Sequence, residues 1–159
     1  MSGPGDLARP SFGEIFMGFA LSLSLRSTCR RAKVGACVVT QDNHRVLAMG
    51  YNGGPRGLDN TCLTDEPGKC GCVHSEANCV VKLDFGDMSL KRMFTTTEPC
   101  RDCACLIVNS SISDVVYLRP YRLHDGLELL ERAGIKVWKF DESLLIPAGA
   151  AGAGGVTQS

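Results

Sequence analysis

The chain has 159 residues, of which 44% are hydrophobic and 21% are charged, as is typical of a globular protein with one core. Seventeen basic residues balance seventeen acidic ones. Because phosphate contacts usually give polynucleotide-binding proteins a basic excess, this balance favours a small substrate over nucleic acid. The sequence shows no apolar run of about 18 residues and no signal-peptide pattern, so we expect a reducing, cytoplasmic compartment and no membrane partner. In that compartment the nine cysteines are more often metal ligands or buried thiols than disulfides.

The first elements predicted are a helix and a pair of strands. Apolar residues recur on one stripe of the segment 11–29, and Ser11 with Glu14 forms a capping-box pattern at its start. Strands are predicted at 34–40 and 45–52, because both segments are rich in apolar residues and the sequence QDNH between them favours a turn.

A glycine-rich loop follows at 53–73, and a loop of that length in a compact domain is normally functional or held in place. Beyond it, helices are predicted at 74–85, 100–109 and 122–133, and strands at 92–98, 114–118 and 136–140. The order predicts an α/β fold, a three-layer α-β-α sandwich with a mixed five-stranded sheet. It would form one domain at 11–146, with a flexible arm at 1–10 and a flexible Gly/Ala tail at 147–159.

Two short motifs, each at the start of a predicted helix, combine metal-ligand chemistry with a carboxylate. His74 and Glu76 form H-x-E, and Cys100 and Cys103 form P-C-x-x-C. One neutral histidine and two thiolates leave the fourth tetrahedral position of a zinc ion for water, with Glu76 beside that water. The combined pattern is the signature of zinc deaminases. The alternative, a closed structural zinc site with Glu76 as a bystander, would need a fourth protein ligand.

Around these motifs the chain resembles the deoxycytidylate deaminases of bacteria and tailed phages, within the cytidine deaminase superfamily. The similar stretches are RSTCRRAKVGACVV (26–39), GYNGGPRGLDNTC (50–62), VHSEAN (73–78), TTTEPCRDCA (95–104) and, more loosely, VVYLRPYRLHDGLELLERAGIKV (115–137). The resemblance covers roughly residues 11–140. It implies the cytidine deaminase fold and the zinc-dependent hydrolysis of dCMP to dUMP and ammonia, which supplies dTMP synthesis in a bacterial cell or a phage-infected host.

One position departs from the pattern of this family, because Ser75 stands where alanine is usual. Serine is nearly as small and keeps the backbone N–H that, by resemblance, helps to hold the pyrimidine, with Glu76 moving protons between water, ring and leaving amine. Deamination of a 5-modified dCMP or of another cytosine or adenine substrate stays open as an alternative. A non-catalytic zinc-binding module is a further alternative, but such a module has no use for Glu76.

The resemblance also suggests residues for the sugar and the phosphate of the substrate. Asn52 would contact the sugar, although Asn-Gly is also a common turn sequence. Four residues are candidates for phosphate contact, against surface or structural roles: Arg26, Arg119, Tyr121 and Arg122. Arg26 follows Leu23 by three positions, near the apolar stripe of the first helix, and a buried-side arginine usually meets an anion. The basic run at 30–33 is typical of a solvated face.

A second, structural zinc site is implied by the resemblance at Cys29, Cys62, Cys70 and Cys72. Four thiolates with no water describe such a site, and the glycine-rich loop needs an anchor. The alternative is four unconnected thiols. The other cysteines, Cys37, Cys79 and Cys105, are predicted to be small buried residues, and Met93, Phe94 and Trp138 are predicted to be core.

Regulation and assembly are also implied by the resemblance. It suggests a homo-oligomer, often a hexamer, activated by dCTP and inhibited by dTTP. The triphosphate, with Mg²⁺, would bind at the loop that contains Gly53, Gly54 and Arg56. The glycines would allow close approach to phosphates, but they also allow an ordinary turn.

Overall fold

The computed structural model describes residues 9–145, so the predicted tail and most of the predicted arm lie outside the described residues. The elements are α1 (Phe12–Ser24), β1 (Gly35–Thr40), β2 (Val46–Tyr51), α2 (Ser75–Val80), β3 (Lys91–Thr97), α3 (Arg101–Val108), β4 (Ile112–Arg119), α4 (Asp125–Arg132), β5 (Lys136–Lys139) and a 3₁₀ turn, η1 (Glu142–Leu144). This order of helices and strands is the one predicted. Within the described part, no helix has the length and hydrophobicity needed to cross a bilayer.

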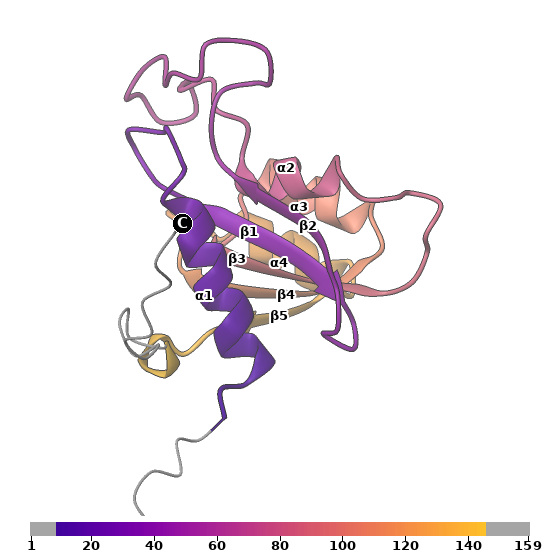
Figure 1. Ribbon diagram of the computed structural model, residues 1–159. Coiled ribbons are helices and arrows are strands. Elements are labelled where there is room, and N and C mark those ends of the chain that lie inside the picture. The colour runs from indigo at the N-terminus through magenta and orange to yellow at the C-terminus, as the bar shows by residue number, and fades with distance from the viewer. Residues whose placement is uncertain (1–8, 146–159) are drawn as a thin grey trace, which may run out of the picture.

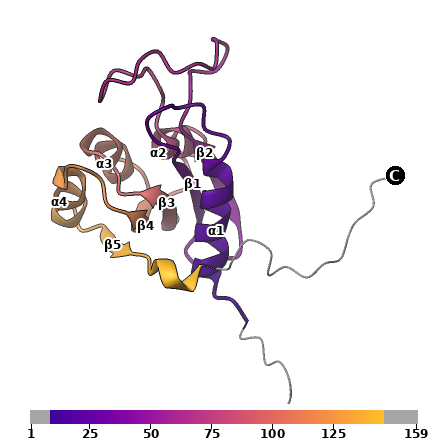
Figure 2. The same cartoon turned by 90° about the vertical axis from the view of Figure 1, so that its left-hand side faces the viewer.

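The five strands form one mixed sheet in the order β2-β1-β3-β4-β5 (Figure 1). Strand β1 pairs antiparallel with β2 and β3, whereas β3, β4 and β5 run parallel to one another. Helix α1 covers one face, and α2, α3 and α4 cover the other (Figure 2). The predicted three-layer α/β sandwich is therefore confirmed.

Two apolar clusters fill the spaces between the layers. Phe16 and Met17 of α1 pack with Phe94 on one face of the sheet, whereas Met93 and Ile107 belong to the cluster on the other face. Successive strand residues point to opposite faces, so neighbours such as Met93 and Phe94 enter different clusters. Both faces of β1 are covered, which explains why its sequence is almost continuously apolar.

Most of the predicted core residues are buried, but two are not. Burial raises the pKa of the Cys37 thiol to about 12, as expected for an inert core cysteine. Cys105 is exposed on α3, and Trp138 is 45% exposed on β5, so the prediction that these two are core is wrong. Strand β5 has four residues at the edge of the sheet, and α1 packs on β1 and β3 instead.

All four helices are shorter than predicted, and the largest differences lie at the C-terminal ends of α1 and α2. Helix α1 ends at Ser24, and the backbone N–H of Arg26 and of Ser27 then bond to carbonyls three residues back, at 3.0 Å each, which closes the helix in a tight turn. Helix α2 ends at Val80, and the carboxylate of Asp84 accepts the N–H of Gly86 at 2.8 Å in the turn that follows.

Two glycines set how closely the helices approach the segments that carry the predicted metal ligands. A Cβ atom added at Gly50 of β2 would lie 2.6 Å from the carbonyl oxygen of Ser75, at the start of α2. A Cβ atom added at Gly126 of α4 would overlap the carbonyl oxygen of Pro99, next to Cys100. These contacts leave no room for any larger residue.

We therefore expect Gly126→Ala to destabilise the protein by about 1–3 kcal/mol, because overpacking outweighs the better helix propensity of alanine. Gly18→Ala in α1 is the matched control, because a Cβ there meets nothing within 4 Å, and it should stabilise by about 0.5–1 kcal/mol. Urea unfolding followed by circular dichroism measures both. Equal stability of the two variants would contradict this account.

Candidate metal centre and substrate cavity

The two predicted metal-binding motifs meet where α2 and α3 begin. His74 is the N-cap residue of α2 and Cys100 is the N-cap residue of α3, both with extended backbone, and the two helices lie side by side (Figure 1). Cys103 lies one turn into α3. As a result, the sulfur atoms of Cys100 and Cys103 each lie 3.4 Å from Nδ1 of His74.

This arrangement of donor atoms fits a zinc ion. The ligand atoms of His74, Cys100 and Cys103 all lie within 4.8 Å of one another. In a tetrahedral site with Zn–S of about 2.3 Å and Zn–N of about 2.0–2.1 Å, nitrogen and sulfur ligands are roughly 3.5 Å apart. One imidazole and two thiolates leave one position open, as in catalytic zinc sites.

Hydrogen bonds among these three side chains shift their pKa values. A hydrogen bond from the Cys103 thiol, followed by one from His74, lowers the pKa of Cys100 to about 4. The bond to Cys100 raises the pKa of His74 to about 9. The pKa of Cys103 is raised by its bond to Cys100 and by burial. The group thus carries a thiolate at neutral pH, the form of cysteine that binds zinc.

Glu76 lies beside these ligands in the first turn of α2. Glu76 is 4% exposed, and burial raises the pKa of its carboxyl. The Ser75 hydroxyl donates a hydrogen bond to Oε2 of Glu76 at 2.9 Å. A buried carboxyl with a raised pKa can exchange protons near neutral pH. The serine at the position where alanine is usual therefore contacts this group directly.

A cavity of about 100 Å³ opens at these residues. Its walls are Cys29, Arg31, Ala32, Val34, Asn52, Cys70, Cys72, His74, Ser75, Glu76, Thr97, Glu98, Cys100 and Tyr121. The predicted substrate residues Asn52, Ser75 and Tyr121 are thus brought together with Glu76. Asn52 is buried, accepts the N–H of Val34 at 2.8 Å and donates to the carbonyl of Ala32 at 2.7 Å, so it also fixes the wall.

Of the three predicted arginines, only Arg122 lies next to this cavity. Arg26 is exposed beyond the end of α1, with its guanidinium 5.7 Å from the centre of the Tyr51 ring, so the prediction of a buried-side position is wrong. Arg119 is exposed, pairs with Glu142 at 3.3 Å and lines a different cavity. Arg122 is also exposed and lies 5.6 Å from the centre of the Tyr121 ring, next to the cavity wall.

Two charged wall residues were missed by the sequence reasoning. Arg31 belongs to the basic run at 30–33, which is typical of a solvated face, and no local pattern distinguishes it from its neighbours. Glu98 is buried at the end of β3, directly before Pro99. A signal for Glu98 was present, because it is an acidic residue that interrupts an uncharged strand end next to a metal ligand.

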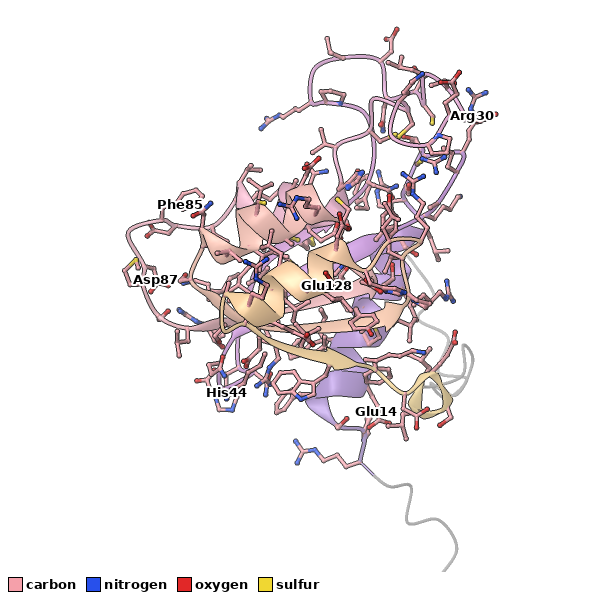
Figure 3. The ribbon with its side chains drawn as sticks, turned by 180° about the vertical axis from the view of Figure 1, so that it is seen from behind. Glu14, Arg30, His44, Phe85, Asp87 and Glu128 are labelled. Atoms are coloured by element: carbon pink, nitrogen blue, oxygen red, sulfur yellow. The ribbon has the colours of Figure 1, made fainter. Side chains whose placement is uncertain are left out.

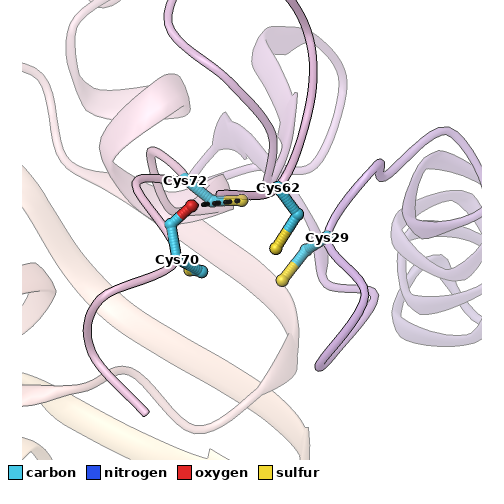
Figure 4. Close-up of side chains that lie close together, drawn as sticks. All are labelled: Cys29, Cys62, Cys70 and Cys72. Atoms are coloured by element: carbon cyan, nitrogen blue, oxygen red, sulfur yellow. Dashed lines mark hydrogen bonds between the residues drawn. The ribbon is translucent and has the colours of Figure 1, made fainter. Parts of the chain in front are cut away.

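The other four predicted metal ligands also come together. The sulfur atoms of Cys29, Cys62, Cys70 and Cys72 lie within 4.8 Å of one another, although they come from three separate segments (Figure 4). The N–H of Leu63 donates to the carbonyl of Cys70 at 3.0 Å. Three of the four cysteines also line the cavity that contains Glu76. The cluster could hold a metal ion and, at the same time, fix part of the cavity wall.

The predicted effector residues line a second cavity, of about 390 Å³. Its walls are Tyr51, Gly53, Gly54, Pro55, Arg56, Gly57, Leu58, Asn60, Asn78 and Lys82. Lys82 was not predicted; its Nζ donates to the carbonyl of Met49 at 2.6 Å. Arg56 and Lys82 give this cavity two cationic side chains, which suits a phosphorylated ligand.

Comparison with known proteins identifies the family to which this chain is similar. The family model of the cytidine and deoxycytidylate deaminase zinc-binding region matches residues 10–119. Deoxycytidylate deaminase of Mycobacterium phage D29 is 37% identical over 126 residues, which cover 70% of this chain and 97% of the phage protein. Deoxycytidylate deaminase of Saccharomyces cerevisiae is 34% identical over 147 residues, which cover 84% of this chain, and the match spans 46% of the yeast protein.

Solved structures of deaminases are also similar to this chain. The dCMP deaminase of cyanophage S-TIM5, in complex with dCMP and dUMP, superposes with a TM-score of 0.74 at 33% identity and covers 83% of this chain and 98% of that one. Acinetobacter baumannii RibD, at 20% identity and a TM-score of 0.63, shares the fold, with 84% of this chain and 36% of that one covered. On its matched sequence, its fold and its three-ligand site, the chain belongs to the cytidine and deoxycytidylate deaminase family of zinc-binding enzymes.

Proposed function

We propose that the protein hydrolyses dCMP to dUMP and ammonia. The observation that carries this proposal is the buried carboxyl of Glu76 in one cavity with the three-ligand group of His74, Cys100 and Cys103. The phage D29 relative, covered over 97% of its length, is a deoxycytidylate deaminase, and the cyanophage enzyme binds dCMP and dUMP. A purely structural zinc site would have no need of a buried acid next to its ligands.

His74, Cys100 and Cys103 would hold zinc, which lowers the pKa of a water molecule towards 7 and so supplies a nucleophile at neutral pH. Glu76 takes a proton from this water and delivers it to N3 of the pyrimidine. It then passes a proton to the amino group at C4, which leaves as ammonia while oxygen from water takes its place. Burial favours this role, because it raises the pKa of Glu76 towards the range in which a carboxyl can both accept and donate.

The walls of the cavity would orient the nucleotide. The backbone N–H of Ser75 would hold the pyrimidine, and the Asn52 side chain would contact the sugar while it fixes the wall. For the phosphate we favour Arg31, which lines the cavity, with Tyr121 and the adjacent Arg122. The positions of Arg26 and Arg119 do not support a phosphate contact in a single chain.

We also propose a second, structural zinc ion at Cys29, Cys62, Cys70 and Cys72. The convergence of four sulfur atoms supports it, as does the position of Arg30, whose hydrogen bonding lowers the pKa of the Cys62 thiol. A metal ion there would anchor the long glycine-rich loop, which contains few apolar residues of its own.

We also propose that nucleoside triphosphates regulate the activity. The cavity formed by Gly53, Gly54 and Arg56 would bind a nucleoside triphosphate with Mg²⁺, with dCTP as activator and dTTP as inhibitor. Lys82 would add a second cation. Exposed apolar side chains after α2, including Phe85 and Met88, support assembly into a homo-oligomer, for which we propose a hexamer.

An ammonia-release assay tests the activity. We expect turnover of dCMP in preference to 5-methyl-dCMP, 5-hydroxymethyl-dCMP, CMP and deoxycytidine. Glu76→Gln should lower kcat by about 10²–10⁴-fold while the zinc content stays unchanged, because the variant loses proton transfer but no ligand. Preference for a 5-modified nucleotide would support the alternative substrate. Wild-type turnover by Glu76→Gln would refute the role of Glu76.

Metal analysis tests the structural site. We expect two zinc ions per wild-type chain and one in Cys62→Ser, with a lower melting temperature because the loop loses its anchor. Cys105→Ser is the matched control, since Cys105 is exposed on α3, and it should keep both ions. A single zinc ion in the wild-type chain would remove the claim of a second site.

Kinetics with effectors test the regulation. The rate should depend sigmoidally on dCMP, and dCTP with Mg²⁺ should make the dependence hyperbolic. Arg56→Ala should weaken this response several-fold without altering the rate at saturating dCMP. Lys136→Ala, at an exposed position of β5, serves as the charge-matched control. Hyperbolic kinetics that ignore both dCTP and dTTP would contradict the proposal.

A further inference from the structure

The buried acid Glu98 has no part in the mechanism above, although it lines the substrate cavity. Its side chain is 0% exposed and lies two residues before the metal ligand Cys100. Burying a carboxylate is costly unless hydrogen bonds or charges compensate it. The partners of Glu98 therefore indicate what the residue is for.

The hydrogen-bond partners of the Glu98 side chain lie in one loop, between β4 and α4. The N–H of Tyr121 donates to Oε2 of Glu98 at 3.2 Å. Nδ1 of His124 lies 2.9 Å from Oε1 and 3.0 Å from Oε2, and because a carboxylate only accepts, His124 is the donor. The backbone N–H of Glu98 donates to the carbonyl of Arg119 at 2.8 Å. Residue 98 thus bonds to the loop at Tyr121 and His124 and to the end of β4 at Arg119.

This loop contributes one residue to the wall of the cavity. Tyr121 lines the cavity, and Arg122 lies next to its ring. The loop has no secondary structure of its own before α4 begins. His124 is the N-cap residue of α4 but makes no side-chain cap bond, because its ring nitrogen is committed to Glu98. The bond between His124 and Glu98 therefore holds the loop and does not cap the helix.

We propose that Glu98 and His124 are a positioning pair that fixes Tyr121 in the cavity wall and so sets the affinity for the nucleotide. The inference rests on the proposed dCMP deaminase activity. Both oxygens of Glu98 are occupied by the loop, so Glu98 is not available for proton transfer to the substrate. Loss of the pair should raise KM and leave kcat nearly unchanged, because Glu76 and the metal ligands keep their places.

The decisive variant is His124→Ala, because the His124 side chain is 64% exposed and its removal leaves the core intact. Losing a hydrogen bond to a charged group corresponds to roughly a tenfold rise in KM for dCMP, with kcat changed by less than about threefold. His124→Asn, which keeps a donor, should recover part of the affinity. His44→Ala is the control: His44 lies 3.7 Å from Asp42 in an exposed turn, at the end of the molecule opposite Arg30 (Figure 3).

Three further experiments separate positioning from a general structural effect. Amide hydrogen exchange should become faster at Tyr121 in His124→Ala and stay unchanged in His44→Ala, since the Tyr121 N–H loses a fixed acceptor. The affinity for dUMP, measured by calorimetry, should fall by the same factor as the rise in KM. When His124→Ala is added to Glu98→Gln, KM for dCMP should change little further, because both substitutions act on one contact.

The outcomes distinguish this inference from the proposed function. If the unaltered protein does not turn over dCMP, the proposed function fails, and the dUMP titration of His124→Ala still tests the pair. A KM and a dUMP affinity within twofold of those of His44→Ala would overturn the inference. So would a loss of kcat or of zinc in His124→Ala with KM unchanged, since the pair would then act on the metal centre.

Discussion

The structure depends on the contact between the start of α2 and the start of α3, where Nδ1 of His74 lies 3.4 Å from two sulfur atoms. This contact exists because β1 and β3 are adjacent in the sheet and both helices cover the same face. The close approach of Gly50 to Ser75 and of Gly126 to Pro99 sets how deeply the helices sit. Close packing at these glycines restricts the movement of the segments that carry the predicted metal ligands.

Two buried acids beside this contact differ in their surroundings and hence in the roles that we propose for them. Glu98 has both oxygens committed to the loop that precedes α4, so it acts as a fixed acceptor. Glu76 accepts a hydrogen bond from Ser75, and burial raises the pKa of its carboxyl, so it is suited to exchanging protons. Environment, and not residue type, separates the positioning role proposed for Glu98 from the proton-transfer role proposed for Glu76.

The substrate cavity also connects the two predicted metal sites. Cys29, Cys70 and Cys72 line it together with His74 and Cys100. The segment after Cys29 supplies Arg31 and is held by Asn52 through Val34. Order in the glycine-rich loop is therefore coupled to the shape of the substrate cavity, which gives a physical reason for anchoring a long loop far from any core cluster.

The sequence by itself determined the order of the elements and the two metal-ligand motifs, because helix caps, apolar periodicity and short ligand spacings are local properties. It did not determine which arginine faces the cavity. The apolar stripe predicted a helix up to residue 29, but α1 ends at Ser24, so Arg26 lies beyond the helix. The Glu98–His124 bond and the exposure of Trp138 were also decided by tertiary structure. Each of these depends on which distant segments pack together, and no local pattern encodes that choice.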